Sequence, residues 1–393
     1  MIREQTIVCF ANDWHADPTS KHQLMRRFAP DNQVLWVESP GMRAPRFSQS
    51  KDLRRIVTKL RTLGRPAEQQ LPNLHVCSPA TVPFPQNPVA RAVNGWLYRR
   101  TIRRELRRLS LDERPIVWAF VPHIAPAIRG LARRLLVYSC VDRWSAFADY
   151  DADLMTAFEA DVCRAADVVL ASAQDLADHC RQYNAEVHYV PHGVDTEHFA
   201  RAFTPGALPD VLAAIPEPRV GFFGVLHEWV DIELLAALAR RTPFHYVLIG
   251  EAWTDLSALA GLGNVHVLGR QPYARLPDFC RGFRAGIVPF RVNTLTASVN
   301  PIKLREYAAA GLPVVSAALP EALRAGDFVD CPRTEDEWVV AVTRAVDRGG
   351  SVAERQRQAQ RVRGEGWRAV ASRIGDIFAE HLNGHAARAA RPR

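Results

Sequence analysis

The sequence lacks any hydrophobic run long enough to cross a membrane as a helix. Such a helix needs about 20 consecutive apolar residues, and no run of eighteen or more occurs in the 393 residues. The chain enters the apolar run Thr6–Phe10 without the charged, apolar and small-residue succession of a signal peptide. These absences predict a cytoplasmic protein rather than a secreted or membrane-spanning one.

Paired cysteines are also missing. The seven cysteines are odd in number and scattered, and none belongs to a C-x-x-C pair. This pattern argues against a disulfide framework and against a thiolate zinc site, and it indicates a reducing compartment.

Acidic residues are scarce in one part of the chain. Residues 43–134 hold nineteen Lys or Arg against five Asp or Glu, a balance of +14, so the remaining residues carry −6 of the total +8. Two helical patterns in this region, 51–65 and 89–109, mix apolar faces with arginines. Basic amphipathic helices suit an anionic membrane surface, and the alternative is an ordinary domain helix in an arginine-rich protein. No nucleic-acid-binding module is recognisable, so nucleic acid is not an expected partner.

What the chain has in abundance is apolar runs of strand length that alternate with helical stretches. With 48% hydrophobic residues it can bury large cores and is expected to form two domains. The alternation predicts an α/β fold of doubly wound parallel sheets with helices on both faces. A linker is expected near 196–214, which contains Pro205, Gly206 and Pro209.

One segment, 300–316, reads NPIKLREYAAAGLPVVS. Asn300 followed by Pro301 predicts a helix start, and Gly311 predicts its end. Lys303 and Glu306 lie three residues apart and share a face near the helix N-terminus, which attracts anions. At this spacing the Lys303 cation could bind a diphosphate and the Glu306 carboxylate a diol, and a nucleotide sugar carries both groups. The alternative is that Lys303 and Glu306 form an ordinary ion pair on the surface of a helix.

Four motifs in order along the chain resemble the GT-B glycosyltransferases, in particular the bacterial group 1 enzymes of polysaccharide and teichuronic acid type. They are 300–316, VPHGVDTEHF at 190–199, LVYSCVDRW at 136–144 and ADVVLAS at 166–172. In the second of these, His192 replaces the family's usual Asn. The resemblance covers roughly residues 5 to 382.

The resemblance implies two Rossmann-like domains that face a central cleft. It places an acceptor domain at 1–199, a nucleotide-sugar domain at 200–366, a helix at 367–383 that packs back on the first domain, and a disordered tail at 384–393. The implied reaction moves a sugar from a nucleoside-diphosphate sugar to an acceptor hydroxyl in bacterial glycan or glycolipid assembly, without a metal or other cofactor. Alternatives are a GT-B sugar-nucleotide epimerase and a non-catalytic partner subunit.

Donor-binding residues are expected at the carboxyl ends of strands in the second domain, where such folds bind ligands. Gly224 ends a G-x-x-G motif whose glycines allow backbone to approach a phosphate, although tight packing explains it equally. The full set of expected donor residues is Gly224, Arg270, Gln271, Asn300, Pro301, Lys303 and Glu306.

Asp142 is the expected catalytic residue. It follows the strand 135–139, in a segment that resembles the strand end of the xanthan glucuronosyltransferase, an inverting enzyme, and it could act as general base. The alternative is a loop-capping Asp or one paired with Arg143. Retaining relatives carry E-x7-E, whose first position here is Ser298, and this departure favours inversion. The letters D-x-D at 151–153 are expected to cap a helix rather than hold a metal.

Acceptor contacts are expected from Asp13, Trp14 and His22, which follow the first strand, and from His123. Trp14 could stack on a sugar face or simply pack, and His123 could equally be a buried or capping residue. The acceptor is expected to be a glycan, a lipid-linked sugar or a small molecule. With the basic region, these expectations predict a peripheral protein on the inner face of the plasma membrane.

Overall fold

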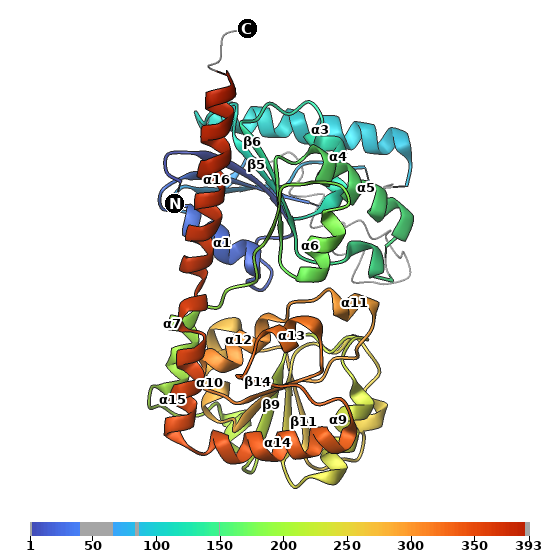
Figure 1. Ribbon diagram of the computed structural model, residues 1–393, viewed down its shortest axis with the longest axis vertical. Coiled ribbons are helices and arrows are strands. Elements are labelled where there is room, and N and C mark those ends of the chain that lie inside the picture. The colour runs from blue at the N-terminus through green and yellow to red at the C-terminus, as the bar shows by residue number, and fades with distance from the viewer. Residues whose placement is uncertain (1, 40–65, 83–85, 149, 390–393) are drawn as a thin grey trace. The chain divides into compact units, whose positions relative to one another are not determined.

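The computed structural model describes residues 2–39, 66–82, 86–148 and 150–389, and its chain forms two compact units (Figure 1). The first unit comprises residues 1–191 and 370–393, and the second comprises 192–369. Each contains a doubly wound, largely parallel sheet, as predicted. The predicted helix at 51–65 lies outside the described residues.

The sheet of the first unit has eight strands in the order β3-β4-β2-β1-β5-β6-β7-β8. All neighbours pair in parallel except β3 with β4. The strands are β1 (Thr6–Ala11), β2 (Gln33–Glu38), β3 (Glu68–Leu71), β4 (Leu74–Cys77), β5 (Ile116–Ala119), β6 (Leu135–Cys140), β7 (Val168–Ala171) and β8 (Val187–Tyr189). β3 was not predicted, because its sequence EQQL has no apolar run.

Helices cover both faces of this sheet, because alternate residues of its strands are buried on opposite sides. Val8 and Phe10 face a core that includes residues of α3 (Pro88–Arg108), α4 (Ala125–Ile128), α5 (Ala152–Ala165) and α6 (Gln174–Cys180). On the other face, Trp118 packs edge-on against Phe28 of α1 (Ser20–Phe28) and Phe378 of α16 (Trp367–Ala389). The carboxyl-terminal helix therefore covers the first sheet.

The sheet of the second unit has six parallel strands in the order β11-β10-β9-β12-β13-β14. They are β9 (Arg219–Phe223), β10 (His245–Ile249), β11 (Val265–Gly269), β12 (Ala285–Val288), β13 (Val314–Ser316) and β14 (Val329–Asp330). Its helices are α7 (Thr196–Ala200), α8 (Asp210–Ala213), α9 (Ile232–Arg241), α10 (Leu276–Arg281), α11 (Thr294–Ala297), α12 (Ile302–Ala309), α13 (Pro320–Arg324), α14 (Glu335–Gly349) and α15 (Val352–Arg361).

Two predicted boundaries are wrong. The division between the units falls after Pro191, not at 199, because Phe199 of α7 is fully buried in the core of the second unit. The expected linker at 196–214 is consequently folded, with α7 and α8 inside it. The last helix continues to Ala389 rather than ending at 383, since its Ala-rich end has high helix propensity.

Candidate active site

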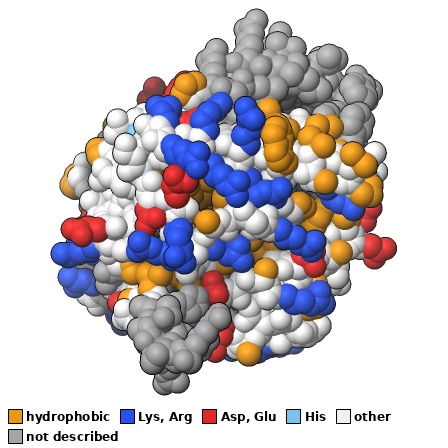
Figure 2. Space-filling model, turned by 90° about the horizontal axis from the view of Figure 1, so that it is seen from above, with side chains coloured by type: hydrophobic (Ala, Val, Ile, Leu, Met, Phe, Trp, Pro, Cys, Tyr) orange, Lys and Arg blue, Asp and Glu red, His pale blue; other side chains and the backbone are white. Residues whose placement is uncertain are grey.

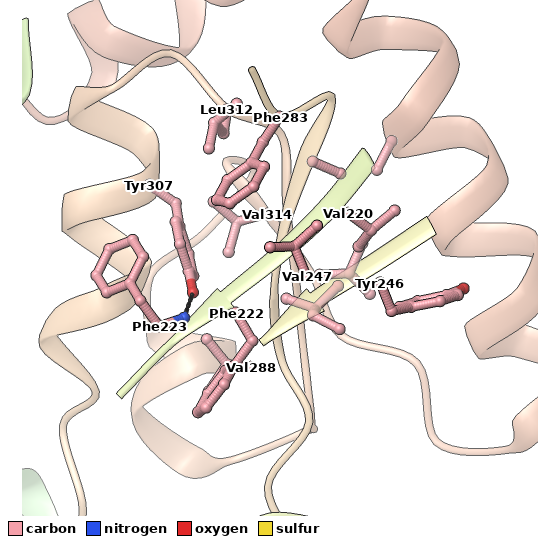
Figure 3. Close-up of a cluster of buried hydrophobic side chains, with 14 of the residues drawn as sticks. Val220, Phe222, Phe223, Tyr246, Val247, Phe283, Val288, Tyr307, Leu312 and Val314 are labelled. Atoms are coloured by element: carbon pink, nitrogen blue, oxygen red, sulfur yellow. Dashed lines mark hydrogen bonds between the residues drawn. The ribbon is translucent and has the colours of Figure 1, made fainter. Parts of the chain in front are cut away.

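The helix α12 is fixed on the second sheet by its tyrosine. The backbone N–H of Phe223, at the end of β9, donates to the Tyr307 hydroxyl at 2.9 Å (Figure 3). The ring is fully buried, and a Cβ placed on Gly286 of β12 would lie 2.4 Å from its Cγ. This close packing leaves Lys303 and Glu306, on the preceding turn of α12, in one defined position.

Gly224, which follows β9, leaves room for the Lys303 side chain, and Gly250, which follows β10, leaves room for the backbone of Gly224. Gly224 has φ +143°, and a Cβ there would lie 2.4 Å from Lys303 Cε and 2.9 Å from its Nζ. A Cβ on Gly250, which has φ +155°, would lie 1.9 Å from the Gly224 carbonyl oxygen. The Gly224 N–H already donates to the Ile249 carbonyl at 2.8 Å, so this glycine contributes space rather than a free donor.

Lys303 and Glu306 are neighbouring charged groups that are shielded from solvent to different degrees. Glu306 is only 6% exposed and Lys303 is partly buried, and neither side chain makes a hydrogen bond or ion pair within the described residues. Burial raises the pKa of Glu306 to about 7, with Lys303 opposing and Asp195 reinforcing that rise. Burial also lowers the pKa of Lys303, partly offset by Glu306. Because burying unpaired charge is costly, such groups indicate a ligand site.

Asn300 does not cap the helix as predicted. α12 begins at Ile302 with Pro301 at the N-cap position, one residue later than expected, because the residue before a proline is held extended. Asn300 is buried, accepts from Arg305 Nη1 at 2.9 Å and donates to Glu321 Oε2 at 3.3 Å. These two hydrogen bonds link the segment before α12 to α13.

The other expected donor residues lie at neighbouring positions of the same sheet. Arg270 and Gln271 directly follow β11, which pairs with β10, and Gly269, the last residue of β11, has φ +65°. Arg270 is exposed, whereas the Gln271 amide donates to the Leu268 carbonyl at 3.2 Å. Ser298 ends α11 and is buried, so no carboxylate stands at that position.

A second polar centre lies in the first unit, at the carboxyl end of β6. The carboxylate of Asp142 makes no hydrogen bond or ion pair within the described part of the chain. Burial raises its pKa to about 6, with Lys21 lowering it and Glu159 raising it further. Arg143 instead pairs with Asp175 at 2.6 Å, which contradicts the alternative of an Asp142–Arg143 pair.

Lys21, on the first turn of α1, is the residue that the sequence analysis missed at this centre. It is 7% exposed and forms no hydrogen bond or ion pair with any residue that the structure describes. Burial lowers its pKa, and the nearby Asp142 opposes that shift. A positive charge in the first turn of a helix interacts unfavourably with the helix dipole. The presence of a lysine there was therefore the sequence feature that could have identified Lys21 as a functional residue.

The expected acceptor residues are mostly engaged in packing. Trp14 is 8% exposed, with ring centroids 4.9 Å from Trp36 and 5.3 Å from His22, so it is a core residue rather than an open sugar platform. His22 Nδ1 accepts from the Thr19 N–H at 3.1 Å and caps α1, and burial lowers its pKa to about 4. His123 hydrogen-bonds Ser39 through Nε2.

Asp13 is the one expected acceptor residue that is exposed, although its carboxylate accepts from the His15 N–H at 2.9 Å. The D-x-D letters do cap a helix, as predicted: Asp151 accepts from the Leu154 N–H at 3.0 Å at the start of α5.

Known proteins resemble this chain in sequence and in fold. The profile of the family described as glycosyl transferases group 1 matches residues 217–348, which hold Gly224, Lys303 and Glu306. A putative teichuronic acid biosynthesis glycosyltransferase of Bacillus subtilis is 25% identical over 204 residues, 47% of this chain and 51% of the relative. The chain thus matches about half the length of that curated relative.

Several solved structures match nearly the whole chain, among them the following two. Sucrose-phosphate synthase from Thermosynechococcus elongatus has a TM-score of 0.72 at 14% identity and covers 97% of this chain and 100% of its own. Anabaena HepE in complex with UDP and glucose has a TM-score of 0.66 at 14% identity, and the match covers 96% of this chain and 100% of the HepE chain. The predicted fold is confirmed, because the chain has the GT-B fold of these structures, and residues 217–348 match the group 1 glycosyltransferase family.

Proposed function

We propose that this protein is a glycosyltransferase that moves a sugar from a nucleoside-diphosphate sugar to an acceptor hydroxyl in bacterial glycan or glycolipid assembly. The observation that carries the proposal is the pair Lys303 and Glu306. Glu306 is buried and Lys303 is partly buried, neither makes a hydrogen bond or ion pair within the described residues, and both lie on α12 within the segment that matches the group 1 family. The teichuronic acid relative supports the assignment to glycan assembly.

In the second unit, Lys303 and the N-terminus of α12 neutralise the donor diphosphate. A cation and free N–H groups stabilise the negative charge that develops as the bond from the anomeric carbon to the diphosphate oxygen breaks. Glu306 accepts hydrogen bonds from sugar hydroxyls. Lys303 and the N–H groups of α12 supply the positive charge that stabilises the diphosphate leaving group. We therefore propose that transfer does not require a metal.

In the first unit, Asp142 accepts the proton of the acceptor hydroxyl as that oxygen bonds to the anomeric carbon. A carboxylate with a pKa of about 6 is ionised at neutral pH yet basic enough to take a proton. Lys21 keeps Asp142 ionised. Ser298 occupies the position at which retaining relatives carry a carboxylate. We therefore propose that the acceptor oxygen attacks the anomeric carbon directly, which inverts its configuration.

The protein works at an anionic membrane surface, and α3 is the element that binds there. One face of this helix carries Val89, Val93 and Trp96, which are 71%, 39% and 51% exposed. Trp96 and Arg99, Arg100, Arg103, Arg104 and Arg107 line a hollow of about 460 Å³. Figure 2, which looks onto the α3 side of Figure 1, shows a row of basic side chains there. Exposed aromatic and aliphatic groups beside arginines suit a lipid interface. No helix among the described residues is long and apolar enough to span a membrane.

The test is nucleotide binding followed by transfer. The full chain is screened by thermal shift against UDP, GDP, ADP and dTDP, beginning with UDP because HepE binds it. Charge-assisted contacts contribute about 1.5–3 kcal/mol, so Lys303→Ala is expected to weaken calorimetric binding of the preferred nucleotide about tenfold or more.

The matched control is Arg240→Ala, an exposed cation on α9 of the same unit. Its binding constant should equal that of the unmodified protein. Stabilisation by no nucleotide, or equal affinity in folded Lys303→Ala, contradicts the proposal. Product mass spectrometry with the matching sugar nucleotides then separates a transferase from an epimerase, which returns an isomeric donor, and from a non-catalytic subunit, which returns the donor unchanged.

A further inference from the structure

Three potential metal ligands gather between the edge strand β8 and the helix α16 of the first unit. They are Glu186, His188 and His381, and their ligand atoms all lie within 4.8 Å of one another. Glu186 and His188 are two residues apart on extended chain, so their side chains point to the same side. His381 comes from the far end of the chain, and both segments belong to the first unit.

A hydrogen bond orients the His381 imidazole. Its Nδ1 lies 2.9 Å from the Ile377 carbonyl oxygen, which can only accept, so Nδ1 carries a proton and Nε2 is the nitrogen that can coordinate a metal when the ring is neutral. That Nε2 lies 3.8 Å from Glu186 Oε2. A carbonyl that orients the far nitrogen of a histidine is the usual support of a metal ligand.

His188 is the unexplained member of the cluster. Its Nε2 is buried and has no hydrogen-bond partner, a condition that costs free energy unless a ligand satisfies the atom. The nearby Arg373 donates to the Tyr189 carbonyl at 2.8 Å, so it is already engaged with backbone.

We infer that Glu186, His188 and His381 form a binding site for a divalent transition metal, with zinc as the best match to two imidazoles and a carboxylate. Zinc takes such ligands at about 2.0–2.2 Å in a tetrahedron and leaves the fourth position to water. The three atoms must close to separations of about 3.3 Å in that geometry. Glu186 is exposed and can move inward. The bound metal would join α16 to the edge of the first sheet, a stabilising role separate from sugar transfer.

The experiment uses the full chain without a histidine tag. The protein is stripped with a chelator, dialysed against zinc and then against buffer, and its metal content and melting temperature are measured. We expect about one zinc per chain and a melting temperature several degrees above the stripped protein. His188→Ala and His381→Ala should each lose the zinc and the thermal gain.

Two further variants keep the result interpretable. Glu186→Gln alters an exposed group, so it should fold normally and weaken zinc binding at least tenfold. His266→Ala is the matched control, because the second unit contains another pair of neighbouring histidines. In this pair His266 Nε2 lies 3.0 Å from His245 Nδ1. Zinc retention by this control supports the inference.

Failure of the unmodified protein to retain zinc overturns the inference. So does undiminished zinc in the three ligand variants, or loss of zinc in His266→Ala alone. Nucleotide binding serves as an independent readout, and it should be the same in stripped and zinc-loaded protein because Lys303 and Glu306 take no part in the metal site.

Discussion

Four charged side chains are buried or partly buried and make no hydrogen bond or ion pair within the described residues: Lys21 and Asp142 in the first unit, and Lys303 and Glu306 in the second. In each pair the cation offsets part of the cost of burying the carboxylate. A folded chain retains such unpaired groups at the expense of stability, and function is the usual reason.

Asp142→Asn tests the general base directly. The amide preserves the shape of the side chain but cannot accept the proton, so turnover should fall about 10²–10⁴-fold. Nucleotide affinity should hardly change, because Lys303 and Glu306 belong to the other unit. The measurements are steady-state kinetics and calorimetry. A folded Asp142→Asn protein with near-normal turnover would place the base elsewhere and remove the main support for inversion.

The pH dependence gives an independent test of Asp142 and of Lys21. Asp142 must be ionised to act, so kcat/KM should fall as pH drops below about 6. Lys21 lowers this pKa, and Lys21→Met should therefore shift the acid limb to higher pH. Arg26→Met, at an exposed position of the same helix, is the control and should leave the limb in place. An unshifted profile in Lys21→Met would mean that the lysine does not act through Asp142.

At the scale of elements, the second unit brings its charged groups together by fitting a helix against glycines at strand ends. Gly224→Ala would place a methyl group 2.4 Å from Lys303 Cε and impose φ +143° on a residue with a side chain. We expect nucleotide affinity to fall about tenfold as Lys303 is displaced.

Gly263→Ala is the control for this change, because a Cβ at Gly263 has open space around it and no unusual φ. Calorimetry on both variants measures whether only Gly224→Ala weakens nucleotide binding. Normal affinity in Gly224→Ala would show that Lys303 tolerates displacement or does not contact the ligand.

The exposed face of α3 predicts salt-sensitive binding to anionic vesicles. Each arginine near such a surface contributes about 1 kcal/mol, so Arg100→Gln with Arg103→Gln should reduce partitioning roughly thirtyfold. Co-sedimentation should require anionic lipid and weaken at high salt. The control pair is Arg240→Gln with Arg324→Gln, two exposed arginines of the second unit. Equal recovery on neutral vesicles, or no loss in the α3 variant, would contradict this role.

At the scale of the whole molecule, the chain leaves the first unit after Pro191 and returns to it at Val370, through α16. Phe378 of this helix is fully buried, 4.9 Å from the Trp118 ring and 6.1 Å from the Phe28 ring. The return of the chain therefore completes the core on one face of the first sheet.

Phe378→Ala should destabilise the first unit by roughly 3–5 kcal/mol, since it removes a buried ring and leaves a cavity. Urea unfolding followed by tryptophan fluorescence would report the change, as Trp118 adjoins the site. Asn383→Ala, an exposed position of α16, should leave the midpoint unchanged. A similar midpoint for Phe378→Ala would mean that α16 adds little to this core.

Much of the fold was predictable because its signals are local. Apolar runs such as 135–139 and 219–223 became the central strands β6 and β9, and Gly311 does end α12. The misses have equally physical causes. β3 forms from polar residues because β4 offers it an open edge, and α12 begins one residue later than predicted because Pro301 holds Asn300 extended.

The sequence by itself determined two parallel-sheet folds and the Lys303–Glu306 pair, because strand periodicity, helix caps and a spacing of three residues depend on near neighbours. Only the tertiary structure decided which charges lose water. Asp142 and Lys21, or His188 and His381, meet through segments far apart in the chain. Desolvation and electrostatic coupling depend on distance in space, so no local pattern records them.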